Sequence, residues 1–226
     1  MLMLETHSLC KNYGRRHREV VGLQDVGVQV GRGEFVALVG PSGSGKTTLL
    51  LSLGGLIRPS SGTVHIDGVS VYDLTPSRRI ELRRSLIGFL FQTFNLVPYL
   101  TALENVQVPL MIAGKDRGEQ RRIAESILER VGLGHRLDHK PCELSVGQQQ
   151  RVAFARTLAN SPSIILADEP TGNLDPDTAQ SVMEMLQDLN REGMTIAMVT
   201  HDPRMAALAG RLVRLVDGRI AAGSAA

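Results

Sequence analysis

The sequence is poor in aromatic residues and carries almost no net charge. Of its 226 residues, three are tyrosine, five are phenylalanine and none is tryptophan. A nucleic-acid-binding surface typically combines a basic stripe with aromatic side chains. Here the formal net charge is only +2, and the lysines and arginines are scattered along the chain. We therefore expect no nucleic-acid partner.

Cysteine and long apolar runs are also scarce. Cys10 and Cys142 form no CxxC pair, which favours reduced thiols in a cytosolic protein over a disulfide framework or a metal site. No apolar stretch approaches the roughly 20 residues that cross a bilayer. Met1 to Cys10 lacks the basic region and apolar run of a signal peptide. We expect a cytoplasmic chain, which reaches a membrane only through a partner.

Short apolar runs alternate with helical patterns. With 42% hydrophobic residues the chain can build a sizeable core. Runs of this kind indicate strands that are buried on both faces, and alternation of strands with helices predicts an α/β fold with a mostly parallel sheet. The expected strands are Phe35–Val39, Ser163–Ala167 and Met194–Val199, and the expected helices are about Lys46–Ile57 and Pro176–Arg191.

Two further regions differ from this alternation. Near the start, Leu23–Val30 alternates as a strand does, and Thr63–Ile66 predicts a strand before an Asp-Gly turn. In the middle, Thr101–Ala113 and Arg117–Val131 read as helices, the second with apolar residues on one face and charges on the other. We predict a helical lobe inserted between two parts of the α/β core.

A phosphate-binding loop lies between a predicted buried strand and a predicted helix. The segment GPSGSGKT matches the pattern GxxxxGK[ST] in the required setting. Glycines let backbone N–H groups turn toward phosphates, and the helix N-terminus adds positive potential. Lys46 is expected to reach the β- and γ-phosphates, and the Thr47 hydroxyl to ligate Mg²⁺. The expected phosphate ligands are Gly40, Pro41, Ser42, Gly43, Ser44, Gly45, Lys46 and Thr47.

A pair of carboxylates follows the buried run Ser163–Ala167. Asp168 ends that strand, where a carboxylate is costly unless it holds a metal or a strong donor. In a phosphate-loop protein we expect this strand to lie beside the strand that precedes the loop, so that Asp168 holds Mg²⁺ through water. Glu169 is one step further on and can act as general base toward water. A pair that merely caps a loop is the alternative.

The segment LSVGQ, Leu144–Gln148, followed by QQRVAFAR, resembles the signature of ABC ATPases. The resemblance covers nearly the whole chain. It implies ATP and Mg²⁺ as ligands and the phosphate-loop cassette fold, with an N-terminal antiparallel β subdomain and an inserted helical subdomain. The expected boundaries are 1–91 and 160–226 for the core with the β subdomain, and 92–159 for the helical subdomain.

The signature implies a homodimer. Ser145 and the amide of Gly147 at a helix start offer a second anion site, and one chain needs only one γ-phosphate site. In the family, each signature closes the nucleotide site of the other chain, and Gln148 belongs to the same motif. Val146 departs from the glycine of the commonest signature. Because valine resists positive φ, we expect this departure to affect hydrolysis and not binding.

The resemblance assigns roles to further positions. Tyr13 resembles the aromatic residue that stacks on adenine, a surface tyrosine being the alternative, and Thr48 joins the nucleotide-binding set. Gln92 resembles the glutamine that contacts Mg²⁺ and water. Asp175 belongs to the loop that crosses the dimer interface, and His201 resembles the switch histidine at the γ-phosphate. The implied catalytic set is Lys46, Gln92, Glu169 and His201, and the implied metal set is Thr47, Gln92 and Asp168.

Within the family, Phe91–Val106 and Asp168–Asp175 resemble ATP-binding subunits of lipoprotein-release and macrolide-export systems. The resemblance implies a separate transmembrane permease as partner, with the cassette at the inner face of the membrane. Three apolar residues, Phe94, Leu96 and Tyr99, suggest part of a groove for the permease; packing inside the helical lobe is the alternative.

Other functions remain open from sequence. The segment between phosphate loop and signature shows no sustained heptads, which disfavours an ABC protein acting on DNA, and the single cassette disfavours a translation factor. A solute importer, or a cell-division or signalling complex that moves no substrate, stays possible. The basic run Arg15–Arg18 is interpreted as a solvated hairpin tip, with a contact to anionic lipid or to a permease loop as the alternative.

Overall fold

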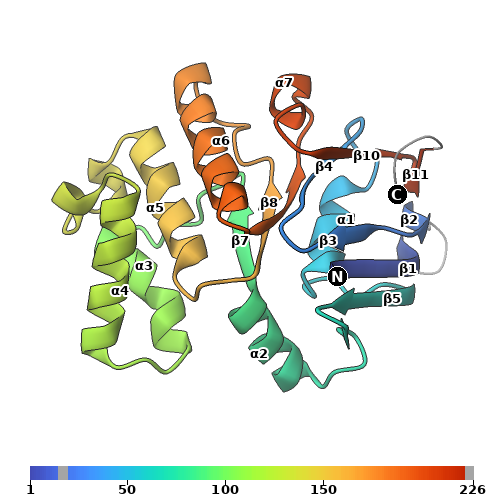
Figure 1. The fold of residues 1–226 in the computed structure, drawn as a ribbon, viewed down its shortest axis with the longest axis horizontal. Helices are drawn as coiled ribbons and strands as arrows, with labels where there is room; N and C mark the ends of the chain where they lie inside the picture. The colour runs from blue at the N-terminus through green and yellow to red at the C-terminus, as the bar shows by residue number, and fades with distance from the viewer. Residues whose placement is uncertain (15–19, 222–226) are drawn as a thin grey trace.

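Two β-sheets occupy the middle and one end of the molecule, and a group of helices occupies the other end (Figure 1). The structure is a computed structural model and describes residues 1–14 and 20–221. The basic run Arg15–Arg18 lies outside the described residues.

The larger sheet forms the middle of the α/β core. Its order is β11-β10-β4-β9-β8-β7, and all neighbours pair in parallel except the β10–β11 hairpin. The mostly parallel sheet predicted from the buried runs is confirmed. The strands are β4 Phe35–Val39, β7 Ile87–Phe91, β8 Ile164–Asp168, β9 Thr195–Val199, β10 Arg211–Val216 and β11 Arg219–Ile220.

One predicted neighbour relation is wrong. The strand that ends in Asp168, β8, was expected beside β4, but β9 lies between them and pairs with both. Strand order depends on how the connections cross the sheet, which the local apolar pattern does not encode.

The smaller sheet is the N-terminal antiparallel one. Its central strand β1 pairs with β2, β3 and β5, and β5 forms a hairpin with β6. The predicted strand Leu23–Val30 is two strands instead, separated at Gly27 and Val28. The strands are β1 Leu2–Tyr13, β2 Val20–Val26, β3 Gln29–Gly31, β5 Ser61–Ile66 and β6 Val69–Ser70.

Seven α-helices are present in the described residues. The predicted helix from Lys46 ends at Leu53 and not at Ile57, because Gly54 and Gly55 follow and Gly55 has φ of 69°. The helices are α1 Lys46–Leu53, α2 Pro76–Leu86, α3 Ala102–Ile112, α4 Arg117–Arg130, α5 Val146–Leu158, α6 Pro176–Arg191 and α7 Pro203–Ala206, with short 3-10 turns at Gly134–Arg136 and Pro141–Glu143.

The two faces of the large sheet belong to two hydrophobic cores. In β4, Val36 and Leu38 pack with the leucines of α1 and the small sheet. Phe35 and Ala37 point the other way, into the core that joins α3–α6 to the sheet. Both faces of the sheet are thus covered, as the continuous apolar runs predict.

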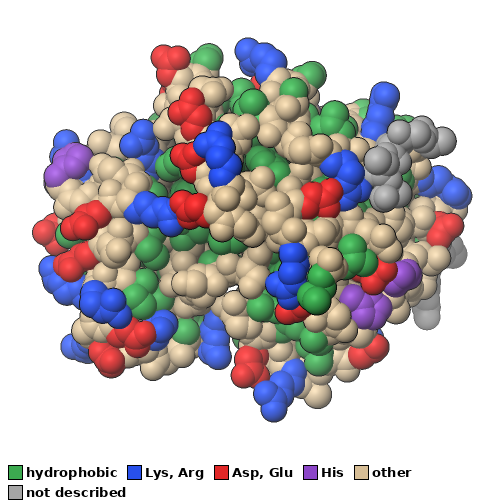
Figure 2. Space-filling view, viewed as in Figure 1, with side chains coloured by type: hydrophobic (Ala, Val, Ile, Leu, Met, Phe, Trp, Pro, Cys, Tyr) green, Lys and Arg blue, Asp and Glu red, His purple; other side chains and the backbone are tan. Residues whose placement is uncertain are grey.

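The surface carries mixed charge. Figure 2 shows acidic and basic side chains interspersed with apolar ones over the face in view, with no stripe of one sign. Among the described residues, no helix combines the length and apolar character that crossing a bilayer requires.

Candidate active site

Four neighbouring parallel strands end at the same edge of the large sheet. The phosphate loop follows β4, His201 follows β9, Asp168 ends β8, and Gln92 follows β7. Loops at the carboxyl ends of parallel strands are where α/β proteins bind ligands. The fold therefore brings together residues that lie more than 100 positions apart in sequence.

The phosphate loop, Gly40–Thr47, wraps around its own lysine. Gly45 is the N-cap of α1 in a left-handed conformation, with φ of 99°, and a Cβ there would lie 2.2 Å from the carbonyl oxygen of Gly22. Lys46 is 6% exposed, and its Nζ donates to the carbonyls of Gly40 (2.9 Å) and Pro41 (2.8 Å). The Ser44 hydroxyl is buried without a hydrogen-bond partner among the described residues. A phosphate would supply oxygens to these donors.

Thr47 and Asp168 meet despite the intervening strand. Thr47 Oγ1 donates to Asp168 Oδ1 over 3.1 Å. Burial raises the pKa of Asp168 above its ordinary value, the negative charge of Glu169 raises it further, and the hydrogen bond from Thr47 opposes the rise. The Thr47 hydroxyl and the Asp168 carboxylate are hard oxygen ligands, and Mg²⁺ prefers such ligands.

The side chains of Glu169 and His201 meet across the ends of β8 and β9. Glu169 Oε2 lies 3.1 Å from His201 Nδ1, and the Glu169 amide donates to the carbonyl of Val199 over 2.9 Å. Glu169 has φ of 45°, a conformation that a residue with a long side chain adopts at a cost. The carboxylate lies next to His201, at the carboxyl ends of β8 and β9.

Gln92 lies against the same carboxylate loop. A Cβ added at Gly172 would lie 2.9 Å from Gln92 Nε2 and 3.4 Å from Glu169 Oε2. Asn173 Nδ2 donates to the backbone carbonyl of Gln92 over 3.2 Å. The structure thus brings Gln92, Asp168, Glu169 and His201 together around the phosphate loop.

The signature begins α5 with a complete capping box. Ser145 Oγ accepts from the amide of Gln148 (3.3 Å), and Gln148 Oε1 accepts from the amide of Ser145 (3.0 Å). Val146 is half exposed and does not have positive φ, so its branched side chain imposes no backbone strain. Gly147 lies against α6, because a Cβ there would lie 2.9 Å from Thr178 Cγ2.

In these contacts the signature faces α6 and not the phosphate loop of its own chain. Helix α5 and helix α1 lie in different parts of the molecule (Figure 1). The second anion site expected at Ser145 and Gly147 is therefore separate from the first.

Asp175 and Tyr13 take up peripheral positions. Asp175 is the N-cap of α6 and accepts from the Thr178 amide over 3.0 Å. Hydrogen bonds from Thr178 lower the pKa of Asp175. The Tyr13 hydroxyl forms a hydrogen bond with Thr48 Oγ1 over 3.2 Å, and its ring, 39% exposed, lies beside the start of α1. An exposed ring next to the phosphate loop can stack on a base.

Two residues within the signature helix have roles that the sequence did not reveal. Gln150 is fully buried, and its Nε2 donates to the carbonyl of Pro170 over 2.9 Å, directly after Glu169. Arg156 donates to the carbonyls of Phe94 (2.7 Å) and Asn95 (2.6 Å), in the segment after Gln92. Gln150 is buried and Arg156 is half-buried, so each interrupts the apolar residues of α5, and that interruption is the signal that could have identified them.

The apolar residues proposed as a permease groove separate into two groups. Phe94 and Leu96 pack against the core that contains α3–α6, as the alternative held, whereas Tyr99 is 73% exposed. An open groove of about 420 Å³ lies elsewhere, between α2, β7, α3 and α5. Its exposed apolar residues are Leu56, Ile80 and Ile112, and its basic residues include Arg83, Arg84 and Arg156.

A phosphate loop after β4, a carboxylate pair at the end of β8 in the same parallel sheet and a signature-like segment at the start of α5 are the features of a phosphate-loop nucleoside triphosphatase of the cassette type. A family profile described as "ABC transporter" matches residues 23–172. The chain belongs to the ABC transporter family.

Two of its relatives are named for transport systems. The chain is 50% identical over 223 residues to the macrolide export ATP-binding/permease protein MacB of Syntrophobacter fumaroxidans, covering 97% of this chain but only 31% of that protein. It is 49% identical over 221 residues to the lipoprotein-releasing system ATP-binding protein LolD of Geobacter metallireducens, covering 97% of this chain and 98% of LolD. The chain thus spans about a third of the MacB relative.

Solved structures agree with the fold. The ATP-binding cassette MJ0796, in a dimeric post-hydrolysis state bound to ADP and Pi, is 43% identical with a TM-score of 0.89, over 96% of both chains. A second dimeric structure of that cassette gives the same values. The predicted ABC-cassette fold is confirmed.

Proposed function

We propose that the chain binds Mg·ATP, hydrolyses it to ADP and phosphate as a head-to-tail homodimer, and thereby drives a separate transmembrane permease. The observation that carries this proposal is the cluster of Thr47, Asp168, Glu169 and His201 beside a phosphate loop, together with a signature that faces away from it. The dimeric MJ0796 cassette and the names MacB and LolD support the assignment.

Each residue of the cluster has a chemical task. Lys46 and the loop amides bind the β- and γ-phosphates, and Tyr13 packs on the adenine. Thr47 and Asp168, with Gln92, would hold Mg²⁺, which bound there would neutralise charge on the phosphate oxygens. Glu169 accepts a proton from the attacking water, whose oxygen bonds to the γ-phosphorus as the bond to the β–γ bridging oxygen breaks.

Groups from both chains stabilise the negative charge that develops on the γ-phosphate. His201, held by Glu169 at 3.1 Å, donates to the γ-phosphate. The amides at the start of α5 of the partner subunit approach the same phosphate, where a helix N-terminus stabilises developing negative charge. Asp175 lies in the loop that crosses the interface. This shared site is an isologous arrangement with twofold symmetry.

Two substitutions separate binding from closure. Lys46→Ala removes the phosphate-loop cation and should weaken binding of a fluorescent ATP analogue to the monomer. Ser145→Arg places a bulky cation at the signature and should leave that binding intact while it abolishes phosphate release. Unchanged ATP titration of Lys46→Ala would refute the phosphate-loop assignment, and full turnover by Ser145→Arg would exclude a shared site.

The groove between α2 and α3 is the proposed docking site for the permease. Its apolar residues are exposed by about half, with Ile80 at 51% and Ile112 at 59%. They line one groove, and grouped exposed apolar side chains mark interaction surfaces. Arg156 connects the groove to the Gln92 segment through its hydrogen bonds to Phe94 and Asn95. Motion at the site can therefore reach the groove.

Crosslinking tests this placement. Cysteine at Ile80 or Ile112 should crosslink to a co-expressed permease, whereas cysteine at Leu212, a similarly exposed residue (46%) on β10, should not. Equal crosslinking from all three positions would contradict the groove as docking site. The identity of the co-purified permease distinguishes an exporter or lipoprotein-release system, which the relatives favour, from an importer or a cell-division complex.

A further inference from the structure

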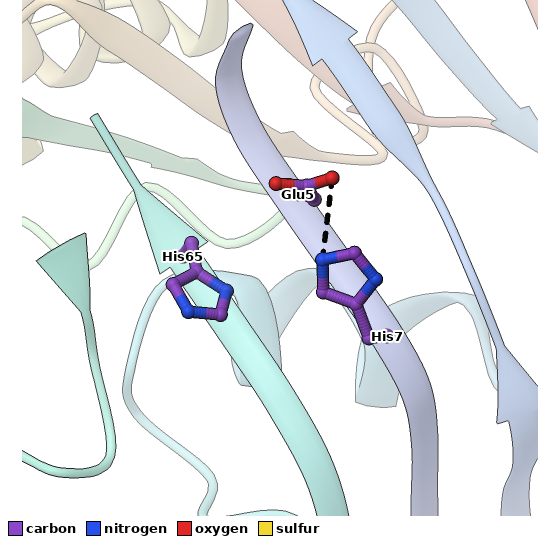
Figure 3. Close-up of side chains that lie close together, drawn as sticks. All are labelled: Glu5, His7 and His65. Carbon is purple, nitrogen blue, oxygen red and sulfur yellow. Dashed lines mark ion pairs between the residues drawn. The ribbon is translucent and has the colours of Figure 1, made fainter. Parts of the chain in front are cut away.

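Three side chains with metal-ligating groups lie on the outer face of the small sheet, away from the nucleotide site. Glu5 and His7 lie on β1, and His65 lies on β5 (Figure 3). In the antiparallel register Glu5 is directly opposite His65, and His7 is opposite Thr63. Because side chains alternate between faces, residues two apart on β1 share a face, so the pairing of β1 with β5 brings all three together.

The inward face of the same strands explains why these residues stay in place. Leu4, Thr6, Val64 and Ile66 alternate with them and are buried in the core. A slip of register by one residue would expose this apolar set. The position of the cluster is therefore fixed by the hydrophobic core.

The three groups are close, and one of them lacks a partner. His7 Nε2 lies 3.2 Å from Glu5 Oε1, and the rings of His7 and His65 are 5.8 Å apart, edge to face. One ligand atom from each residue lies within 4.8 Å of the other two. His65 Nδ1 is buried and has no hydrogen-bond partner among the described residues, although buried polar atoms are normally satisfied.

We propose that Glu5, His7 and His65 form a binding site for a divalent transition metal, with Zn²⁺ as the best fit. Imidazole nitrogens with one carboxylate are ligands that zinc accepts, whereas Mg²⁺ and Ca²⁺ favour oxygen alone. The metal would take the lone pair of His65 Nδ1, and water would complete the fourth position.

The ligands need only a small adjustment. With zinc–ligand bonds of about 2.0–2.2 Å, tetrahedral ligand atoms lie about 3.4 Å apart, so ligand atoms that now lie within 4.8 Å of one another must approach by at most about 1.4 Å. The His7 side chain is 57% exposed and can rotate to do so. Gln29 Nε2 on β3 donates to Glu5 Oε1 over 2.9 Å and orients the carboxylate, as outer-shell partners do in metal sites.

The test is a zinc titration of the full chain, free of any histidine tag and of nucleotide. Cys10→Ser and Cys142→Ser form the background, because both thiols are free and compete for zinc. Competition with a chromogenic chelator should give one zinc per chain. His65→Ala and His7→Ala should each weaken the affinity for zinc by more than about tenfold, because the loss of an outer-shell partner alone costs roughly 10–100-fold. Gln29→Ala removes such an outer-shell partner and should weaken the affinity by roughly 10–100-fold.

His135→Ala is the matched control, because His135 is an exposed histidine outside the cluster, and it should bind zinc as the background does. His7→Ala removes an exposed side chain and is expected to keep the fold, which circular dichroism verifies. Zinc held at the phosphate loop would survive His7→Ala. Co²⁺ in place of zinc should give the strong visible bands of tetrahedral coordination, lost in His7→Ala. Absence of zinc binding by the background chain, or equal affinity in His7→Ala, would overturn the proposal.

Discussion

Replacing Gln150 by leucine should impair ATP turnover while leaving the fold nearly as stable as before. The Nε2 of this buried side chain donates to the carbonyl of Pro170, whereas its Oε1 is buried without a partner among the described residues. Loss of the donor leaves the carbonyl unsatisfied, which costs about 1–3 kcal/mol. Removal of the unpaired Oε1 stabilises the folded chain by a similar free energy, about 1–3 kcal/mol, and leucine fills a comparable volume.

The net change in the free energy of unfolding should therefore lie within about 1 kcal/mol, which corresponds to a Tm shift of no more than about 4 °C for a chain of this size. Turnover should respond differently. The lost bond ties the signature helix to the loop that carries Glu169, and misplacement of a catalytic group by about 1 Å can reduce the rate roughly 100-fold. We expect a loss of about 10- to 100-fold in phosphate release.

Differential scanning calorimetry and a phosphate-release assay measure the two quantities. Gln187→Leu is the matched control, because Gln187 on α6 also donates to a backbone carbonyl, that of Leu208, but lies away from the site. The reasoning is refuted if Gln150→Leu retains control-level turnover, or if its Tm falls by more than about 8 °C.

Three further predictions follow from single contacts. Gly45→Ala should abolish ATP binding in a titration, because its left-handed φ and the nearby Gly22 carbonyl exclude a Cβ; retained affinity would contradict the loop geometry. Tyr13→Phe should keep ATP affinity within about threefold while Tyr13→Ala loses the stacking energy of about 1–3 kcal/mol; equal affinities would remove the stacking role. Burial raises the pKa of Glu34, but the hydrogen bonds from Arg211 and Gly31 outweigh it and lower the pKa below its ordinary 4.5. The stability that Glu34 contributes is therefore present above that value and lost as the pH falls through the lowered pKa, so acid titration of Glu34→Gln should show a weaker loss of stability than the parent chain.

The sequence predicted the parts of the fold and the site that depend on local pattern. The strand–loop–helix setting of Gly40–Thr47, the boundaries of α6 and the short buried strands are confirmed, because glycines, helix caps and apolar runs act over a few residues. The α2 helix was missed because none of its residues is buried, so it has no apolar periodicity to detect.

The parts that were missed depend on long-range arrangement. The insertion of β9 between β4 and β8 is set by the crossovers and not by either strand. The left-handed φ of Glu169 and the buried bond from Gln150 to Pro170 need the assembled loop. Likewise, Glu5 and His65 become neighbours only when β1 pairs with β5. Strand order and strand pairing, which the local sequence does not encode, decide which of these groups meet.

The most direct test of the shared site uses the chain with Glu169→Gln in Mg·ATP, followed by multi-angle light scattering. Since this substitution removes the base but not the phosphate loop or the signature, ATP should accumulate at the interface and hold two copies together. The mass should be twice the 24.5 kDa of one chain, and adding Ser145→Arg should return it to one chain. A Glu169→Gln chain that binds ATP yet stays at the mass of a single chain would contradict the account.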